Sequence, residues 1–325
     1  MTGGFVHRLD PVIGTVAGVH LWWYGAGFAA GFLTLHRYVM RHRAPLGLTR
    51  RDVWALSIVM AAGTLGGGRL VQVLFDEWPF YSAHPGYLPV FWLGGMATHG
   101  LLGGSAAAAA FFAWRWRVPF LPLADVLVVP GAVLMGTGRL GNFIDGQIVG
   151  RVTDVWWGVQ FPYAAGFRHP VVLYDGLKNL LLAAYLWRVR SGPHVPGAVA
   201  ARFVFWYAAP RILIDLLRDY PTYRLALGTG QTLNLAMAAL GVVLLVRSRL
   251  RRLGRLRPRG VPRPRVAADA DPAPLVRQRL AFAAILVACL TMPSNWTQDV
   301  PRRYGGRHPG LVHSVLYPPL EWTPP

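Results

Sequence analysis

A glycine-rich stretch near the middle of the chain, residues 136–151, carries the side chains best suited to chemistry. Arg139 and Asn142 follow an apolar run and are surrounded by glycines at positions 136, 138, 141, 146 and 150. A guanidinium offers a planar fork of donors that matches a phosphate, and glycines allow close approach. The stretch therefore predicts a site for a phosphate-bearing ligand. The alternative is helix packing through small residues, with Arg139 extending its charge toward the membrane surface.

Two further stretches add candidate side chains. His99 lies among glycines in residues 94–104. A histidine can act as a base near neutral pH, although the same glycines would equally serve helix packing. Arg211, Asp215 and Arg218 are spaced four and three residues apart, so they share one helical face. We interpret Arg211 as functional because a charge inside an apolar helix is costly. The other two residues can instead form a paired charge cluster that ends the helix.

The composition indicates which elements must position these residues. Hydrophobic residues make up 54% of the 325 positions and charged residues only 14%, with a mean hydropathy of +0.35. Apolar runs recur along the chain, which predicts an all-α polytopic membrane protein with a seven-helix core. The expected membrane helices are 19–39, 52–75, 90–113, 123–143, 170–187, 203–217 and 231–246.

The end of the chain differs from this core. A shorter apolar run, 279–292, is a candidate eighth helix, although it falls below the ~17–25 residues of an ordinary span. We therefore divide the chain into a membrane-embedded core (1–247), an Arg/Pro-rich cytoplasmic linker (248–278) and a tail with the candidate eighth helix (279–325).

The charge distribution predicts the orientation in the membrane. The formal net charge is +19, almost all of it from arginine, and Lys178 is the only lysine. The arginines concentrate in the loops after the first, third, fifth and seventh predicted helices. The positive-inside rule then puts these loops in the cytoplasm and the N-terminus outside. This rule explains the charge better than nucleic-acid binding, which we do not expect. A single cysteine, Cys289, excludes an intrachain disulfide and a cysteine metal site.

This topology brings four candidate side chains to similar depths. Tyr24 begins the first predicted helix, and His99 lies about nine residues, or ~14 Å, inside the third. Arg139 and Arg211 lie ~6 Å and ~9 Å from the outer ends of their helices. We expect a single cavity that opens to the outer leaflet.

The chain resembles the prolipoprotein diacylglyceryl transferases, a family of bacterial membrane enzymes. The most specific match is Gly138-Arg139-Leu140-Gly141-Asn142-Phe143, continuing through Gly146 and Gly150-Arg151. Supporting matches are Gly94-Gly95-Met96 with His99-Gly100, Arg168-His169-Pro170, Trp23-Tyr24-Gly25 and Tyr207 with Arg211. They follow the family order from residue ~20 to residue ~247, roughly three quarters of the chain.

The resemblance implies transfer of a diacylglyceryl group from phosphatidylglycerol to the lipobox cysteine of a preprolipoprotein. It implies catalytic roles for Tyr24, His99, Arg139 and Arg211, with His99, Tyr24 or a nearby carboxylate as the base that deprotonates the thiol. The implied substrate-binding positions are Arg139, Asn142, Asp145, Gln147, Gly150 and Asp215. We expect a monomer in the bacterial inner (cell) membrane, with preprolipoprotein signal peptides as partners and with no cofactor or metal.

The chain also departs from the family pattern. Asp145 and Gln147 stand where the family usually has asparagine and glutamate, and Asp215 stands where it has glutamate. Val171-Val172 replaces a Ser-Gln pair. Because Gln147 removes a charge from a site position, a rival hypothesis is a catalytically divergent paralogue that acts as a phospholipid-binding or accessory membrane protein.

Overall fold

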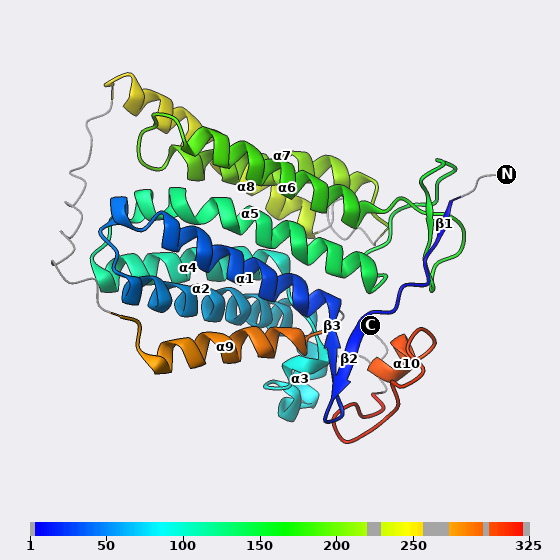
Figure 1. The fold of residues 1–325 in the computed structure, drawn as a ribbon. Helices are drawn as coiled ribbons and strands as arrows, with labels where there is room; N and C mark the ends of the chain where they lie inside the picture. Colours follow the sequence, from blue (N-terminus) through cyan, green and yellow to red (C-terminus); the bar gives the residue numbers. More distant parts are fainter. Residues whose placement is uncertain (1–3, 220–228, 256–272, 295–298, 321–325) are drawn as a thin grey trace.

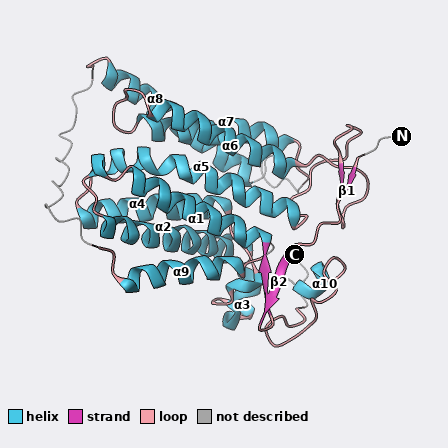
Figure 2. Ribbon diagram, in the orientation of Figure 1, coloured by secondary structure: helices cyan, strands magenta, loops and turns pink. Residues whose placement is uncertain are grey.

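The computed structural model describes residues 4–219, 229–255, 273–294 and 299–320. These residues form a bundle of long helices that lie side by side (Figure 1), with very little strand (Figure 2). The long helices are α1 (Trp23–Arg41), α2 (Arg50–Val71), α4 (Thr98–Trp116), α5 (Phe120–Ile144), α6 (Val171–Arg190), α7 (Ala198–Leu216), α8 (Thr229–Arg252) and α9 (Val276–Leu290).

Helix α5 lies in the middle of the bundle, with α6, α7 and α8 on one side and α1, α2, α4 and α9 on the other (Figure 1). Among the residues that the structure describes, three helical segments are long and apolar enough to cross a membrane: Arg50–Asp76, Phe120–Ile144 and Gly230–Arg252. Most of α5 is apolar and more than half of its span is buried within the bundle, so its few polar side chains face other helices rather than lipid. The prediction of a mainly helical membrane protein is confirmed.

Glycines bring α2 and α4 into close contact. A Cβ atom at Gly104 would lie 2.1 Å from the carbonyl oxygen of Gly63, and one at Gly67 would lie 2.5 Å from that of Gly100. Such contacts are possible only where neither backbone carries a side chain. The glycines that follow His99 therefore serve helix packing, which is the alternative that the sequence left open.

The third membrane helix begins later than the sequence predicts. We expected a helix from residue 90, but Phe91–Leu93 form a short 3-10 turn and α4 starts at Thr98. Gly94 and Gly95 have φ values of +92° and +96°, which interrupt a right-handed helix. His99 therefore lies in the first turn of α4, and the predicted depth of ~14 Å within a helix is wrong.

The first helix is also preceded by strand rather than by helix. β2 (Val12–Val16) pairs antiparallel with β3 (Val19–Trp22), and α1 starts at Trp23 instead of residue 19. The turn residues Ala17 and Gly18 both have positive φ, as a two-residue hairpin of type I′ requires. A second, parallel pair joins β1 (Phe5–Val6) to β4 (Val159–Gln160), and the short helices are α3 (Trp78–Ala83) and α10 (Val300–Tyr304).

The candidate eighth helix forms as α9 and runs antiparallel to α1. At one end Gln278 donates a hydrogen bond to the carbonyl oxygen of Arg51, at the start of α2. At the other end the backbone of Cys289 packs directly against Gly25, near the start of α1. The residues after α9 therefore lie at the end of the bundle that carries the β2–β3 hairpin (Figure 1).

Candidate functional site

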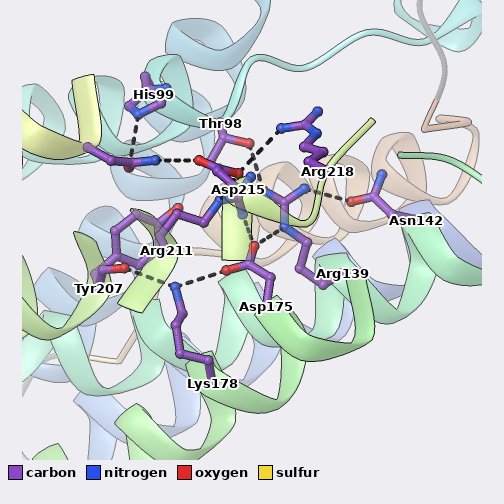
Figure 3. A network of polar contacts seen from close by, with 11 residues as sticks. Thr98, His99, Arg139, Asn142, Asp175, Lys178, Tyr207, Arg211, Asp215 and Arg218 are labelled. Atoms are coloured by element: carbon purple, nitrogen blue, oxygen red, sulfur yellow. Dashed lines mark hydrogen bonds and ion pairs between the residues drawn. The ribbon is translucent and has the colours of Figure 1, made fainter. Parts of the chain in front are cut away.

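A buried carboxylate on α6 joins two arginines from different helices. Arg139 of α5 donates from Nε to Asp175 Oδ2 at 2.6 Å, and Arg211 of α7 donates from Nη1 to the same oxygen. The Nζ atom of Lys178 lies 2.9 Å from Asp175 Oδ1. Figure 3 shows these side chains converging from α5, α6 and α7. Because Asp175 is only 2% exposed, its charge requires these partners.

The remaining edges of the Arg139 guanidinium are also occupied. Nη1 donates to Asn142 Oδ1 at 3.1 Å, and Nη2 donates to Thr98 Oγ1 at 3.0 Å. Asn142 lies three residues further along α5 and so shares the face of Arg139. The structure thus brings Arg139 and Asn142 together with the start of α4, and Arg139 is buried rather than extended to the membrane surface.

A chain of polar contacts leads from Arg211 to His99. Arg211 Nε donates to Asp215 Oδ1 at 3.1 Å, and Asn234 Nδ2 donates to Asp215 Oδ2 at 3.0 Å. The Oδ1 atom of Asn234 then lies 3.4 Å from His99 Nε2 (Figure 3). Because Asn234 presents its carbonyl oxygen, Nε2 carries the hydrogen and the lone pair of the ring is on Nδ1. Arg218 Nη1 lies 3.9 Å from Asp215 Oδ1, so the two residues form the charge pair that the sequence offered as an alternative.

These charged groups border a small cavity. Its volume is about 10 Å³, which is room for about one water molecule. Both charged and aliphatic side chains line it. The lining residues are Arg139, Ile148, Val171, Val172, Asp175, Arg211, Ile214, Asp215 and Arg218. The lining thus contains three arginines, two carboxylates and four aliphatic side chains, and two of the aliphatic residues are the valines that depart from the family pattern.

Tyr24 and Gly150 lie beside the network rather than in it. Tyr24 faces α5, where a Cβ atom at Gly141 would lie 2.4 Å from its Cα, and its ring packs edge to face on Phe28. A Cβ atom at Gly150 would lie 2.4 Å from the carbonyl oxygen of His169 and 2.9 Å from that of Leu217. Gly150 therefore lets the loop after α5 pass between the ends of α6 and α7.

The other two predicted binding residues face the C-terminal segment instead of the cavity. Asp145 Oδ2 accepts a hydrogen bond from the backbone N–H of Ser294 at 2.9 Å. Burial raises the pKa of Asp145 to about 7, against the opposing effects of Ser294 and Arg307. Gln147 Nε2 lies 3.4 Å from the hydroxyl oxygen of Tyr304. Neither residue lines the cavity beside Arg139.

Sequence reasoning missed the central carboxylate and its lysine. Asp175 and Lys178 are the only Asp, Glu, Lys or Arg residues in the predicted helix 170–187, and they are three residues apart. An opposite pair with this spacing inside an apolar helix was a readable signal of a buried ion pair. Asn234 and Thr98 carried no comparable signal, because only the packing of α8 and of the start of α4 brings them to the network.

Comparisons with known proteins agree with these motifs. Residues 11–247 match the sequence model of the family described as Prolipoprotein diacylglyceryl transferase. The chain is 36% identical over 256 residues to a phosphatidylglycerol–prolipoprotein diacylglyceryl transferase of Geobacter sulfurreducens, covering 76% of this chain and 98% of the relative. Relatives of the same name from Nitrosomonas europaea and Pseudoalteromonas atlantica are 36% and 32% identical, covering 73% and 81% of this chain and 89% and 97% of their own. The chain therefore belongs to the prolipoprotein diacylglyceryl transferase family.

Proposed function

We propose that this chain transfers a diacylglyceryl group from phosphatidylglycerol to the cysteine thiol of a prolipoprotein. The sulfur forms a bond to a glycerol carbon of the lipid, the bond from that carbon to the phosphate oxygen breaks, and glycerol phosphate leaves. The thiol proton passes to a base. The names of the relatives support this activity, and they do not favour the rival hypothesis of a non-catalytic lipid-binding protein. The structural observation that carries the proposal is the meeting of Arg139 and Arg211 at the cavity.

The charge of the cluster suits this reaction. The cluster contains two carboxylates, Asp175 and Asp215, and its net charge is +2. The four cations are Arg139, Lys178, Arg211 and Arg218. The phosphodiester of phosphatidylglycerol carries one negative charge, and the departing glycerol phosphate carries up to two. The excess positive charge therefore stabilises the leaving group more than the bound lipid. Donors fixed in advance in a site of low dielectric are the most effective at this.

Asp175 keeps the two guanidinium groups in place before the lipid arrives. It holds Arg139 and Arg211 on a single carboxylate oxygen, so both guanidinium groups are directed at one anionic acceptor, as they would be at a phosphate. The incoming phosphate competes for these donors. Since the cavity has room for about one water molecule, the headgroup enters only if side chains of the lining move apart.

We assign the base to His99. Its Nδ1 can accept the thiol proton, while Nε2 remains oriented by Asn234 and, through it, by Asp215. Tyr24 is a weaker candidate because its ring packs on Phe28. The carboxylates of Asp175 and Asp215 are weaker candidates because both already form ion pairs with arginines.

The orientation and oligomeric state follow the same reasoning. Arginines gather at one end of the bundle, where α1, α4, α6 and α8 end, whereas the charged network lies near the outward end of α5. We therefore propose a multi-pass protein of the bacterial inner membrane, with its N-terminus and the network toward the outside. We also propose that it acts as a monomer.

The test is a transfer assay in membranes that contain the protein. A lipobox peptide and phosphatidylglycerol are incubated with these membranes, and the peptide mass is measured. We expect a gain of one diacylglyceryl group with the wild type and with Arg188→Ala, an exposed arginine at the far end of α6. We expect no gain with Arg139→Ala. Lipid binding by a folded wild type without any mass gain would contradict the proposal and support the non-catalytic alternative.

A further inference from the structure

The C-terminal turn of α5 receives its hydrogen bonds from both ends of the chain. His7 Nε2 donates to the carbonyl oxygen of Phe143 at 2.7 Å. Arg307 donates from Nη1 to the carbonyl oxygen of Ile144 at 3.0 Å and from Nη2 to that of Asp145 at 2.7 Å. The last carbonyl groups of a helix have no partners within it, and a cation there also offsets the helix dipole. Arg307 therefore completes the end of α5.

Arg307 belongs to a segment that the family model does not cover. The match ends at residue 247. The segment enters the bundle through α9 and then packs on the N-terminal hairpin. Val300, Tyr304, Leu311 and Tyr317 form one buried cluster with Val12, Trp22 and Leu93. The hydroxyl of Tyr317 accepts a hydrogen bond from the backbone of His20, and His308 Nδ1 lies 2.8 Å from a carboxylate oxygen of Asp10. Arg307 thus belongs to a segment that packs against the N-terminal hairpin.

The carbonyl groups that Arg307 contacts follow shortly after the proposed site residues along the chain. Asn142 and Arg139 lie in the last two turns of α5, and the side chain of Asn142 bonds to Arg139. The turn that follows is closed by the backbone N–H of Gln147, which donates to the carbonyl oxygen of Asn142 at 2.9 Å. Any shift of residues 144–147 therefore moves Asn142, and with it one edge of the Arg139 guanidinium.

We propose that Arg307 is a positioning residue for the transfer reaction, and that the C-terminal segment beyond the family match is a working part of the enzyme. Arg307 fixes the end of α5 and so the orientation of Asn142 and Arg139. The proposal rests on the function proposed above. Arg307 itself contacts backbone oxygens at the end of α5 and at Leu9, and it does not line the cavity.

The expected effect falls on turnover. Removing the guanidinium leaves the carbonyl groups of Ile144 and Asp145 without this donor, so the last turn of α5 loosens. A displacement of about 1 Å at a catalytic group can reduce the rate on the order of a hundredfold. The acyl chains still bind to apolar surfaces away from Arg307. We therefore expect kcat to fall about ten- to a hundredfold while KM for phosphatidylglycerol changes less than about twofold.

The experiment compares Arg307→Gln, Arg307→Lys and Arg302→Gln in the full-length protein. Arg302 is exposed on α10, so its replacement removes the same charge without removing a contact to α5. For each protein we measure kcat, KM, the melting temperature and amide hydrogen exchange over residues 139–150. We expect lower kcat and faster exchange at residues 145–147 for Arg307→Gln, partial rescue by lysine, and wild-type behaviour for Arg302→Gln.

Two results would overturn the proposal. The first is wild-type kcat and exchange in Arg307→Gln. The second is a loss of activity with faster exchange throughout the bundle and a lower melting temperature, because this would mean global destabilisation. If the wild type itself forms no product, the proposed function fails. The exchange data then still decide whether Arg307 holds the end of α5.

Discussion

Replacing Asp175 by asparagine separates the structural cost of the cluster from its affinity for anions. Asp175 is 2% exposed and neutralises part of the charge of Arg139, Lys178 and Arg211. Asparagine keeps the size but removes the negative charge, so the cluster rises from +2 to +3. Removing one partner of a buried ion pair costs about 3–5 kcal/mol, because it leaves the remaining charge uncompensated. We expect a loss of that order in Asp175→Asn.

The matched control is Asp125→Asn on the same helix as Arg139. Asp125 is also 2% exposed, but its carboxylate accepts hydrogen bonds from the backbone N–H groups of Gly197 and Ala200, at 2.7 and 2.8 Å. The carbonyl oxygen of asparagine can replace only one of the two carboxylate oxygens, so one N–H group loses its acceptor but no charge is left unpaired. We therefore expect a smaller loss than in Asp175→Asn, of about 1–2 kcal/mol. Unfolding of the detergent-solubilised proteins by denaturant or heat measures both changes.

Added glycerol phosphate provides the second half of the test. A ligand that binds only the folded state stabilises it in proportion to the logarithm of its concentration over Kd. Because Asp175→Asn leaves four cations facing one remaining carboxylate, glycerol phosphate should raise the melting temperature of this variant more than that of the wild type or of Asp125→Asn. Equal stability losses in the two variants, or no differential effect of glycerol phosphate, would refute the charge argument.

Three other substitutions test separate parts of the account. His99→Gln should lower kcat about 10²–10⁴-fold near pH 7. Activity should recover in part at high pH, because a cysteine thiol has a pKa near 8.5 and then ionises without a base. An equal loss of kcat at every pH would argue against a base at this position. Gly150→Ala should cost about 1–3 kcal/mol in thermal unfolding because its Cβ would meet the carbonyl oxygen of His169, whereas Gly131→Ala, with no atom within 4 Å of the new Cβ, should cost nothing. For Asp145, burial raises the pKa in the folded state to about 7, so between pH ~4 and ~7 the folded protein holds a proton that the unfolded chain has released, and stability falls as pH rises. Asp145→Asn should therefore gain melting temperature relative to the wild type between pH 5 and pH 8, and parallel curves would count against this explanation.

The sequence predicted those parts of the site that depend on local spacing. Arg139 and Asn142 are three residues apart on one helix, and Arg211 and Asp215 are four apart, so a helical period is enough to pair them. The carboxylate that links the two arginines could not be assigned in this way. Asp175 is 36 residues from each of them, and its place depends on how α5, α6 and α7 pack.

The errors in the predicted fold have local causes. Residues 19–22, just before α1, were assigned to a helix, but they form β3, which pairs with β2 across the two-residue turn at Ala17 and Gly18. Apolar residues before α4 were likewise assigned to a helix, although Gly94 and Gly95 adopt positive φ. Hydropathy detects burial in an apolar environment, but it does not detect the backbone conformation that glycine permits.

The roles of Asp145 and Gln147 illustrate a different limit. Their positions in the family motif were the basis for assigning them to the substrate, yet their side chains contact Ser294 and Tyr304, about 150 residues later in the chain. No local pattern reports a contact of that separation. Both side chains thus take their partners from a segment beyond the family region.

The most direct test of the central claim is the stoichiometry of the products. Membranes containing the protein are supplied with phosphatidylglycerol labelled in the headgroup phosphate and with a lipobox peptide, and released glycerol phosphate and modified peptide are counted together. The account predicts one glycerol phosphate per diacylglyceryl peptide for the wild type and for Arg188→Ala, and neither product for Arg139→Ala. Product formation by Arg139→Ala at the wild-type rate would contradict it.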